Sequence, residues 1–229
     1  MSLLRALARS RSGVAMTEFA LGAPLVLMAG LWGTETANYA LTSMKVGQIA
    51  VQIADNASRV GDLSTLQDRR VFESDINDVL YGAQLQAGAL DLFRNGRVII
   101  SSLQVRPIGS AGAGEQYIDW QRCRGALPVN SSYGTEGQDL TNGMGPAGEE
   151  VLAQDGDAVI FVEVRYTYQP LVSDRFIPRE EMSSIASFTV RDDRDISQLY
   201  QRDPAAPDPV QRCNAYNGTI TVNTLGQMN

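Results

Sequence analysis

The sequence contains no histidine and only two cysteines among its 229 residues. Without histidine, a Ser-His-Asp triad, imidazole acid-base catalysis and the usual histidine-containing zinc sites are excluded. The cysteines are not in a Cys-x-x-Cys motif, and no imidazole is present to activate a thiolate. These absences argue against an enzyme and favour a structural or binding protein.

Adjacent acidic residues are the remaining candidates for catalysis, but neighbouring acids usually form solvated surface. The run 154–157 lacks the spaced ligands and terminal Glu of a calcium loop. We therefore expect no catalytic residue, no metal site and no cofactor. The acidic pairs are Glu149-Glu150, Glu180-Glu181 and Asp192-Asp193.

Basic residues are also scarce: 19 Lys and Arg stand against 26 Asp and Glu, a net charge of −7. Arg5, Arg9 and Arg11 lie in the first 13 residues, which hold no acid. The remainder therefore has 19 − 3 = 16 basic and 26 acidic residues, a net charge of −10. Nucleic-acid binding needs Lys and Arg gathered on one face, so we expect no nucleic-acid partner.

A long apolar segment follows the basic leader. From Phe19 to Tyr39 the only charged residue is Glu35, and about twenty apolar residues are enough to cross about 30 Å of hydrocarbon. Arginines that precede a span stay on the cytoplasmic side, so the chain after the span should face outward. We expect Glu35 to mark the outer boundary, with Trp32 and Tyr39 at the interface.

One acidic residue, Glu18, lies at the start of the apolar segment. A carboxylate at the edge of hydrocarbon costs free energy, so a lone Glu there indicates a function. If the chain is cut after Gly13, Val14 becomes the first residue, Glu18 the fifth and Phe19 the sixth. This order of leader, cleavage position and apolar span is opposite to that of a secretory signal peptide, where cleavage follows the apolar region.

The run from Gly13 through Glu18-Phe19 to Pro24 resembles the TadE/TadF family of minor pseudopilins, which belong to the tight-adherence (Flp) type IV pilus system. Two later segments, Ile118–Cys123 and Ala158–Leu171, are similar to segments of the same family. The resemblance therefore frames most of the chain, although residues 58–114 contain no motif of this kind.

The resemblance implies a precursor that a prepilin peptidase cleaves after Gly13 to leave Val14 as the N-terminus. It implies that Glu18 directs processing and assembly, and that Phe19 and Pro24 belong to the anchor. In a pilin-like assembly Glu18 would pair with the α-amino group of Val14 on its own or a neighbouring subunit. Such a pair in low dielectric fixes the register of packed helices.

The implied location is the bacterial inner membrane, with a single span, a cytoplasmic N-terminus and a periplasmic C-terminal domain. The implied function is support of pilus assembly, either within the filament or as a priming complex in the membrane. The implied partners are the prepilin peptidase, the inner-membrane assembly platform, the major pilin and other minor pseudopilins.

Three alternatives stay open. An uncleaved envelope scaffold or binding module of a secretion system would keep its leader and would not depend on Glu18. An anchored hydrolase that uses paired carboxylates would lose turnover when those acids are changed. An ordinary single-pass anchor would give Glu18 and Pro24 no special role.

The sequence as a whole predicts an α+β fold: a long N-terminal transmembrane helix that extends into a small periplasmic domain with an antiparallel sheet and a flanking helix. Apolar periodicity continues the anchor to about Ser58, with a kink expected at Pro24 because proline removes a backbone donor. The expected divisions are a leader (1–13), the helix (14–58) and the domain (59–229).

Within the domain, periodicity predicts one helix and several strands. Val98–Val105 and Tyr117–Gln121 should pair antiparallel. Strand 160–168 should bury one face and leave the other largely solvated. Residues 125–157 should be a long loop. Within 170–182, Phe176, Ile177 and Pro178 should pack over the sheet edge. The expected segments are a helix over 65–93, strands over 97–105, 117–121, 160–168 and 185–190, and a weak strand over 219–222.

The two cysteines, Cys123 and Cys213, most simply form one disulfide if the domain is periplasmic. It would fasten the C-terminal tail to the end of the strand over 117–121. Two free buried thiols are the alternative.

Overall fold

The computed structural model describes residues 12–61, 70–190 and 194–219. The chain forms two compact units: α2 up to Leu41 together with Gln169–Arg179, and Thr42–Tyr168 together with the chain from Glu180 onward. The fold is α+β, as predicted, with a long apolar N-terminal helix and a domain of antiparallel sheet and helices. Arg5, Arg9, Arg11, Asp192-Asp193, residues 65–69 of the expected helix and most of the expected strand over 219–222 lie outside the described residues.

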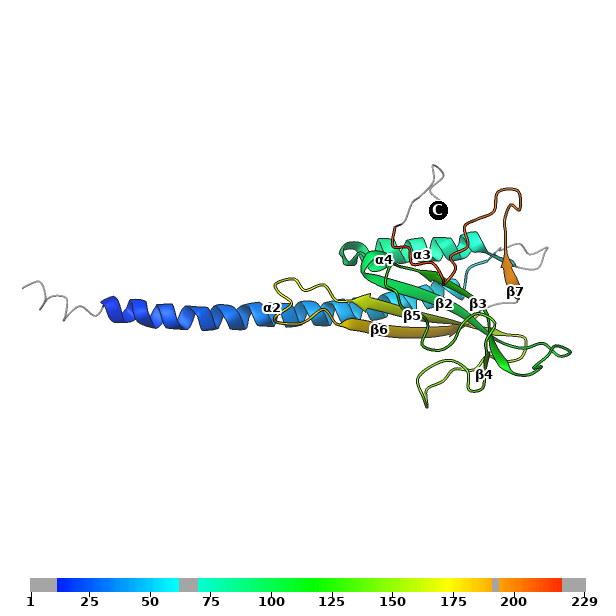
Figure 1. Cartoon of the computed structure of the whole chain (residues 1–229), viewed down its shortest axis with the longest axis horizontal. Coiled ribbons are helices and arrows are strands. Elements are labelled where there is room, and N and C mark those ends of the chain that lie inside the picture. Colours follow the sequence, from blue (N-terminus) through cyan, green and yellow to red (C-terminus); the bar gives the residue numbers. More distant parts are fainter. Residues whose placement is uncertain (1–11, 62–69, 191–193, 220–229) are drawn as a thin grey trace, which may run out of the picture. The chain divides into compact units, whose positions relative to one another are not determined.

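Helix α2 (Ser12–Ala57) is a single helix of 46 residues that continues through Pro24 (Figure 1). Its last third is amphipathic, because apolar residues recur at three- and four-residue steps and enter the core of the domain. The predicted extension to about Ser58 is confirmed by the helix end at Ala57. The buried residues of this part are Val46, Ile49, Ala50, Ile53, Ala54 and Ala57.

The described residues of the domain form a five-stranded sheet in the order β4-β3-β2-β5-β6, in which every neighbouring pair is antiparallel. The predicted antiparallel pairing of 98–105 with 117–121 is confirmed by β2 and β3, with Ser101 opposite Gln121 and a register shift between Ser102 and Leu103. The strands are β2 (Gly96–Val105), β3 (Gln116–Arg124), β4 (Asp139–Leu140), β5 (Ala158–Thr167) and β6 (Glu181–Thr189).

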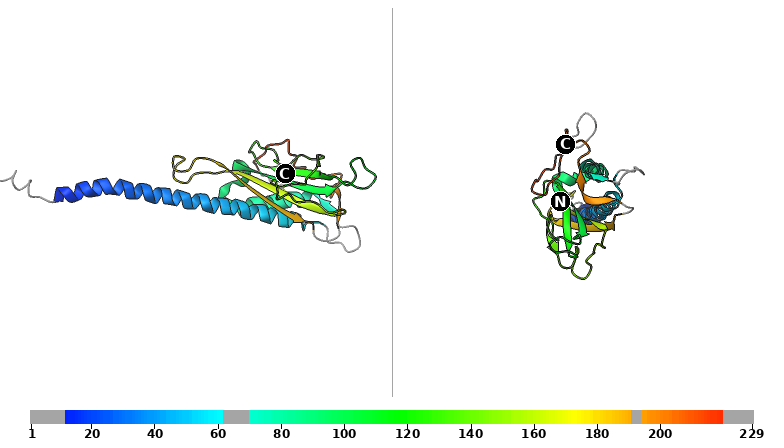
Figure 2. Two further views of the ribbon diagram at one scale, coloured as in Figure 1. Left: turned by 90° about the horizontal axis from the view of Figure 1, so that it is seen from below. Right: turned by 90° about the vertical axis from the view of Figure 1, so that its right-hand side faces the viewer.

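Both faces of the sheet are covered. The end of α2 and helix α3 (Glu73–Ala87) lie side by side, where Asn56 and Val79 line one hollow, and the right-hand view in Figure 2 shows both helices on the same side of the strands. The prediction that strand 160–168 has one largely solvated face was wrong, because nearly all of β5 is buried. The opposite side of the sheet from α2 and α3 is called the second face. Its buried apolar cluster consists of Leu103, Ile118, Met144, Ala153, Val159 and Phe161.

The segment 125–157 is the cover of the second face, although its composition predicted a long loop. It contains β4 and an antiparallel bridge between Met144 and Val151, and Met144 is fully buried. Its first residue, Gly125, has φ 133°, and a Cβ there would lie 2.2 Å from the Gly96 carbonyl oxygen. Glycine is therefore required where this segment leaves β3.

The predicted helix over 65–93 is correct only in part. Arg70–Phe72 forms a short strand, β1, that pairs in parallel with β7 (Asp195–Tyr200), which the sequence did not predict. Helix α3 then begins where the Asp75 carboxylate accepts a hydrogen bond from the Phe72 N–H at 2.9 Å. A 3-10 turn (Gly88–Leu90) and the short helix α4 (Leu92–Asn95) complete the segment.

Helix α3 offers a matched pair of leucines that tests this packing. Leu80 is fully buried, whereas Leu85 on the same helix is 64% exposed. We expect Leu80→Ala to lower the free energy of unfolding by about 2–5 kcal/mol, because it removes buried methyl groups and leaves a cavity. Leu85→Ala should change it by less than about 0.5 kcal/mol. Denaturant unfolding of the full chain in detergent micelles would measure both, and equal losses would contradict the described packing of α3.

Candidate functional site

The five predicted processing and anchor residues lie on the exposed first part of α2. Gly13, Val14, Glu18, Phe19 and Pro24 are all exposed, with Val14 at 56% and Phe19 at 71%. Val14 and Glu18 are four residues apart and therefore share one face of the helix. The Gly13–Val14 peptide lies in the first turn, where the Thr17 hydroxyl donates to the Val14 carbonyl oxygen at 2.8 Å.

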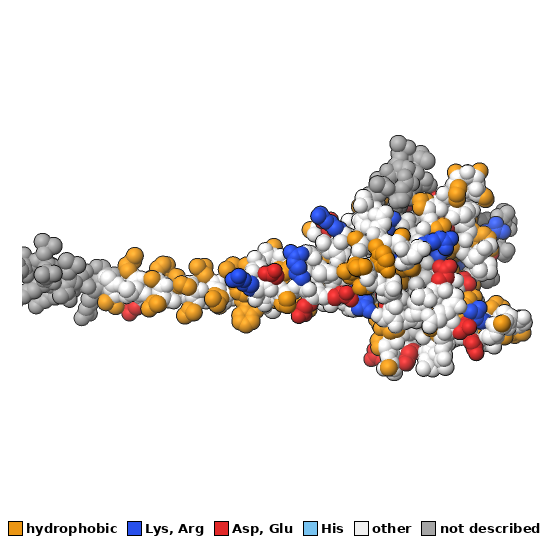
Figure 3. Space-filling view, in the orientation of Figure 1, with side chains coloured by type: hydrophobic (Ala, Val, Ile, Leu, Met, Phe, Trp, Pro, Cys, Tyr) orange, Lys and Arg blue, Asp and Glu red, His pale blue; other side chains and the backbone are white. Residues whose placement is uncertain are grey.

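Among the described residues, α2 is the one helix long and apolar enough to cross a membrane, judged by length and composition. Its most apolar window has a mean hydropathy of 1.7, and none of that window is buried within the protein. Figure 3 shows apolar side chains along the visible face of this part of the helix. Membrane spans and N-terminal signal anchors share these properties.

Two threonine hydroxyl groups of this apolar segment are satisfied within the helix itself. Thr34 donates to the Gly30 carbonyl oxygen and Thr36 to the Trp32 carbonyl oxygen, both at 2.9 Å. This i−4 hydrogen bonding leaves neither threonine proton exposed to a surrounding apolar phase.

Glu35 is fully buried, which the sequence did not predict. Its carboxylate accepts hydrogen bonds from the backbone N–H groups of Leu171 (3.1 Å) and Val172 (2.6 Å). The two residues belong to the loop Gln169–Arg179 between β5 and β6, which Figure 1 shows beside α2. The prediction that Phe176, Ile177 and Pro178 pack over the sheet edge stays a prediction, since Gln169–Arg179 belongs to the compact unit of α2 up to Leu41 and the sheet belongs to the other unit.

The predicted disulfide between Cys123 and Cys213 is confirmed, with an S–S distance of 2.01 Å. Beside it, the Cys123 N–H donates to the Gln211 carbonyl oxygen at 2.8 Å. The C-terminal segment is thus bound to β3 by one covalent bond and by the backbone.

Arg97 forms a second attachment for the same segment. Its guanidinium is fully buried and donates to the carbonyl oxygens of Gly125 (3.0 Å), Ala215 (3.0 Å) and Cys213 (2.7 Å). The group also lies over the Tyr216 ring, 4.3 Å from its centroid. Burial lowers the pKa of Arg97 from its ordinary value, and the carbonyl dipoles and the ring compensate for the lost hydration.

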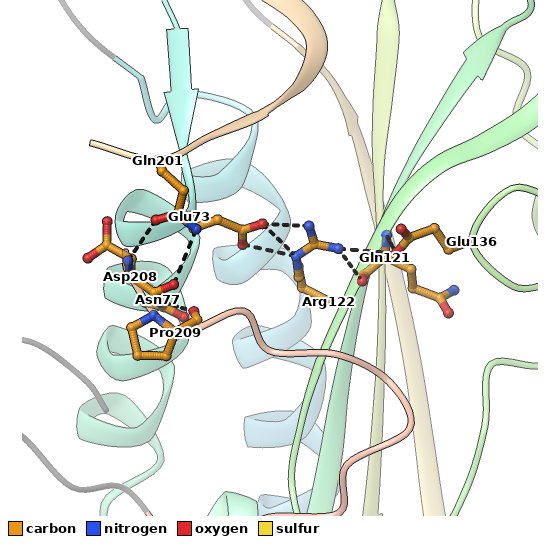
Figure 4. Close-up of polar contacts among 8 residues, drawn as sticks. All are labelled: Glu73, Asn77, Gln121, Arg122, Glu136, Gln201, Asp208 and Pro209. Carbon is orange, nitrogen blue, oxygen red and sulfur yellow. Dashed lines mark hydrogen bonds and ion pairs between the residues drawn. The ribbon is translucent and has the colours of Figure 1, made fainter. Parts of the chain in front are cut away.

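A buried ion pair connects α3 to β3 (Figure 4). Arg122 Nε donates to Glu73 Oε2 at 2.9 Å, and its Nη1 donates to Glu136 Oε2 at 3.1 Å. The Arg122 and Glu73 side chains are only 9% and 4% exposed. Burial lowers the pKa of Arg122, but its contacts with Glu73 and Glu136 raise it on balance. Glu73 is in the first turn of α3, where the helix dipole also favours a negative charge.

The second face of the sheet contains a buried acid, Glu163. Its carboxylate accepts hydrogen bonds from the Ser131 hydroxyl and from the Ser132 N–H, both in the covering segment 125–157. Burial raises the pKa of Glu163, although these hydrogen bonds and the charge of Arg165 lower it in part.

These buried charges connect elements of the fold. No cluster of three or more potential metal ligands occurs in the ranges 12–61, 70–190 and 194–219. No role was predicted from the sequence for Glu73, Arg97, Arg122 or Glu163. A charged residue within an apolar strand pattern could have indicated a buried charge, as Glu163 does between Val162 and Val164.

Comparisons with protein-family models, with curated protein sequences and with solved structures gave no match.

The buried pair predicts unequal effects of two arginine substitutions. Arg122→Met should lower the free energy of unfolding by about 3–5 kcal/mol, because Glu73 is left buried and unpaired. Arg59→Met removes the pair of Arg59 with Asp55, whose side chains are 52% and 29% exposed, and should cost less than about 1 kcal/mol. Denaturant unfolding in micelles measures both changes.

The double variant Glu73→Gln/Arg122→Met separates charge from packing. It should recover much of the loss in Arg122→Met, since no charge is then left uncompensated. A double variant that is as unstable as Arg122→Met would contradict the ion-pair account.

The raised pKa of Glu163 predicts a specific pH dependence. A group whose pKa is raised on folding contributes stability below its unfolded value, here about 4.5, and loses that contribution as pH rises through the folded value. The stability of the native protein minus that of Glu163→Gln should therefore increase as pH falls from neutral toward 4.5. Melting temperatures at each pH would measure this difference.

Glu180→Gln is the control for the pH series, because Glu180 is exposed. Its difference from the native protein should stay constant over the same range. A flat difference for Glu163→Gln as well would contradict a raised pKa at Glu163.

Proposed function

We propose that this protein is a membrane-anchored minor pseudopilin that supports assembly of a tight-adherence (Flp-type) pilus after a prepilin peptidase cleaves it behind Gly13. The observation that carries the proposal is the first part of α2, an exposed apolar helix surface that starts at Gly13 and has one carboxylate, Glu18, at its head. The ordered resemblance of this segment to TadE/TadF proteins supplies the specific function.

The exposed apolar surface of α2 has a physical consequence. Apolar area left in water costs about 25 cal/mol per Å², and large patches of this kind mark membrane or protein contacts. Leu21, Leu25 and Val26 are each more than two-thirds exposed. Lipid or the helices of other subunits must therefore cover this part of the helix.

Glu18 would have a role whether lipid or the helices of other subunits surround it. A carboxylate at the edge of hydrocarbon requires compensation, and cleavage after Gly13 would create a cationic α-amino group at Val14 on the same face of the helix. Between neighbouring subunits this pair would define one axial register. Cleavage and assembly would thereby be coupled through a single carboxylate.

The domain fits a structural role. Its buried Arg122–Glu73 ion pair and its disulfide attach the covering segments to the sheet, and a disulfide favours an oxidising compartment such as the periplasm. We propose the inner membrane as the location, with the N-terminus cytoplasmic and the domain periplasmic. The prepilin peptidase, the inner-membrane assembly platform, the major pilin and other minor pseudopilins are the proposed partners.

Intact-mass and N-terminal peptide analysis of the protein from native membranes tests the proposal. The mature chain should begin at Val14. Glu18→Ala should either block this cleavage or allow cleavage and abolish recovery of the protein in pilus assemblies. Thr17→Ala is the matched control, since it changes the adjacent exposed residue and keeps the carboxylate.

A chain that still begins at Met1, or that is cut after the apolar segment, would refute pseudopilin processing. The first result would favour an uncleaved envelope scaffold. The second would favour an exported binding domain.

A further inference from the structure

We propose that the loop Gln169–Arg179 is a lipid-binding loop that lies on the outer surface of the membrane, where Glu35 holds it against α2 and Leu171 and Val172 insert among the lipid chains at the headgroup boundary. The inference rests on the proposed function only in requiring that α2 spans a membrane. It needs neither cleavage after Gly13 nor pilus assembly.

The position of Glu35 along α2 sets the depth of the loop. Glu35 follows Glu18 by 35 − 18 = 17 positions, which is about 26 Å of helix at 1.5 Å per residue. The hydrocarbon core is about 30 Å thick, so Glu35 lies near one boundary when Glu18 lies at the other. Trp32, one turn before Glu35, is 58% exposed and has the amphipathic ring that favours this interface.

The hydrogen bonds between Glu35 and the loop lower the free-energy cost of placing the carboxylate and the loop backbone at the hydrocarbon boundary. Irregular backbone with unsatisfied N–H groups is excluded from lipid, and so is an uncompensated carboxylate. The N–H groups of Leu171 and Val172 donate to the two oxygens of Glu35. One set of hydrogen bonds thus satisfies the loop backbone and the buried acid together.

After Val172, the loop forms a turn that is closed by hydrogen bonds within the loop itself. The Phe176 N–H donates to the Ser173 carbonyl oxygen at 3.1 Å, and the Arg175 N–H donates to the Ser173 hydroxyl at 3.2 Å. The two apolar side chains that precede this turn are exposed: Leu171 is 66% exposed and Val172 is 37% exposed.

Charge complements this apolar tip. The loop contains Arg175, Arg179 and one acid, Asp174, a net charge of 2 − 1 = +1. The chain after the leader is net acidic, so the loop differs in sign from the protein around it. Exposed arginines beside an apolar tip can pair with lipid phosphates while the tip contacts the acyl chains. A lipid surface is therefore the occupant that the loop fits.

Fluorescence quenching on the full-length protein tests this placement. The protein is reconstituted in vesicles of phosphatidylethanolamine and phosphatidylglycerol that contain phosphatidylcholine with a spin label near the top of the acyl chain. Single cysteines replace Leu171, Leu27 or Leu152 and carry an environment-sensitive fluorophore, while Cys123 and Cys213 stay oxidised. Leu152 is the matched control, because it is a leucine of the domain with 59% exposure.

We expect Leu171→Cys to show a blue-shifted emission and to lose most of its fluorescence to the shallow quencher. Leu152→Cys should show neither change. Leu27 lies midway between Glu18 and Glu35, so Leu27→Cys should respond more strongly to a quencher placed deep in the chains. Adding Glu35→Gln to Leu171→Cys should reduce quenching, because one of the two accepting oxygens becomes a donor.

The outcomes separate the two proposals. Deep quenching at position 27 without quenching at 171 would overturn the lipid-binding loop and leave the membrane span intact, as would a blue shift at 171 that appears only when another protein is added. No quenching at either position would overturn the span and the loop together. Quenching at 171 that Glu35→Gln does not change would overturn the role of Glu35 in holding the loop.

Discussion

The continuity of α2 is the constraint on which the rest of the structure depends. One helix of 46 residues exposes its apolar side chains up to Leu41 and then buries an amphipathic face from Val46 to Ala57 in the domain. The same backbone must therefore suit two surroundings. In the first part the large apolar side chains are exposed, although Glu35 is buried. In the second part the spacing of small and β-branched residues matches the sheet against which they pack.

Buried charged groups fasten the covering segments to the sheet. Arg122 with Glu73 binds α3, Arg97 binds the C-terminal segment, and Glu163 binds the segment that begins after β3. A buried ion pair adds less stability than an apolar contact of equal volume, but breaking it is costly. Other arrangements of the covering segments would leave these charges buried and unpaired, so they are disfavoured. This restriction matters because the segment 125–157 and the C-terminal segment are rich in glycine and proline.

Elements that show a clear periodicity could be predicted from the sequence. Elements whose structure depends on contacts with residues distant in the sequence could not. The anchor helix, the antiparallel strands and the pairing of Cys123 with Cys213 were predicted because each depends on a local pattern or on a single possible partner. Strand β1 was missed because three residues carry no pattern and their partner, β7, lies more than a hundred residues away. The alternation in β5 was misread because Glu163 looks solvated in sequence, whereas two serines from another segment hold it in the interior.

For the candidate site, the roles of Gly13, Glu18 and Pro24 stay predictions, and the sequence assigned Glu35 only a position at the boundary. Two amides that follow Pro170 determine its environment, and no spacing rule links residues 35 and 171. Two of the segments that resemble TadE/TadF proteins contain polar attachments of this chain. Ile118–Cys123 includes Arg122 and Cys123, and Ala158–Leu171 ends at Leu171, whose N–H donates to Glu35. These contacts join residues far apart in the sequence, so the pattern of either segment alone does not predict them.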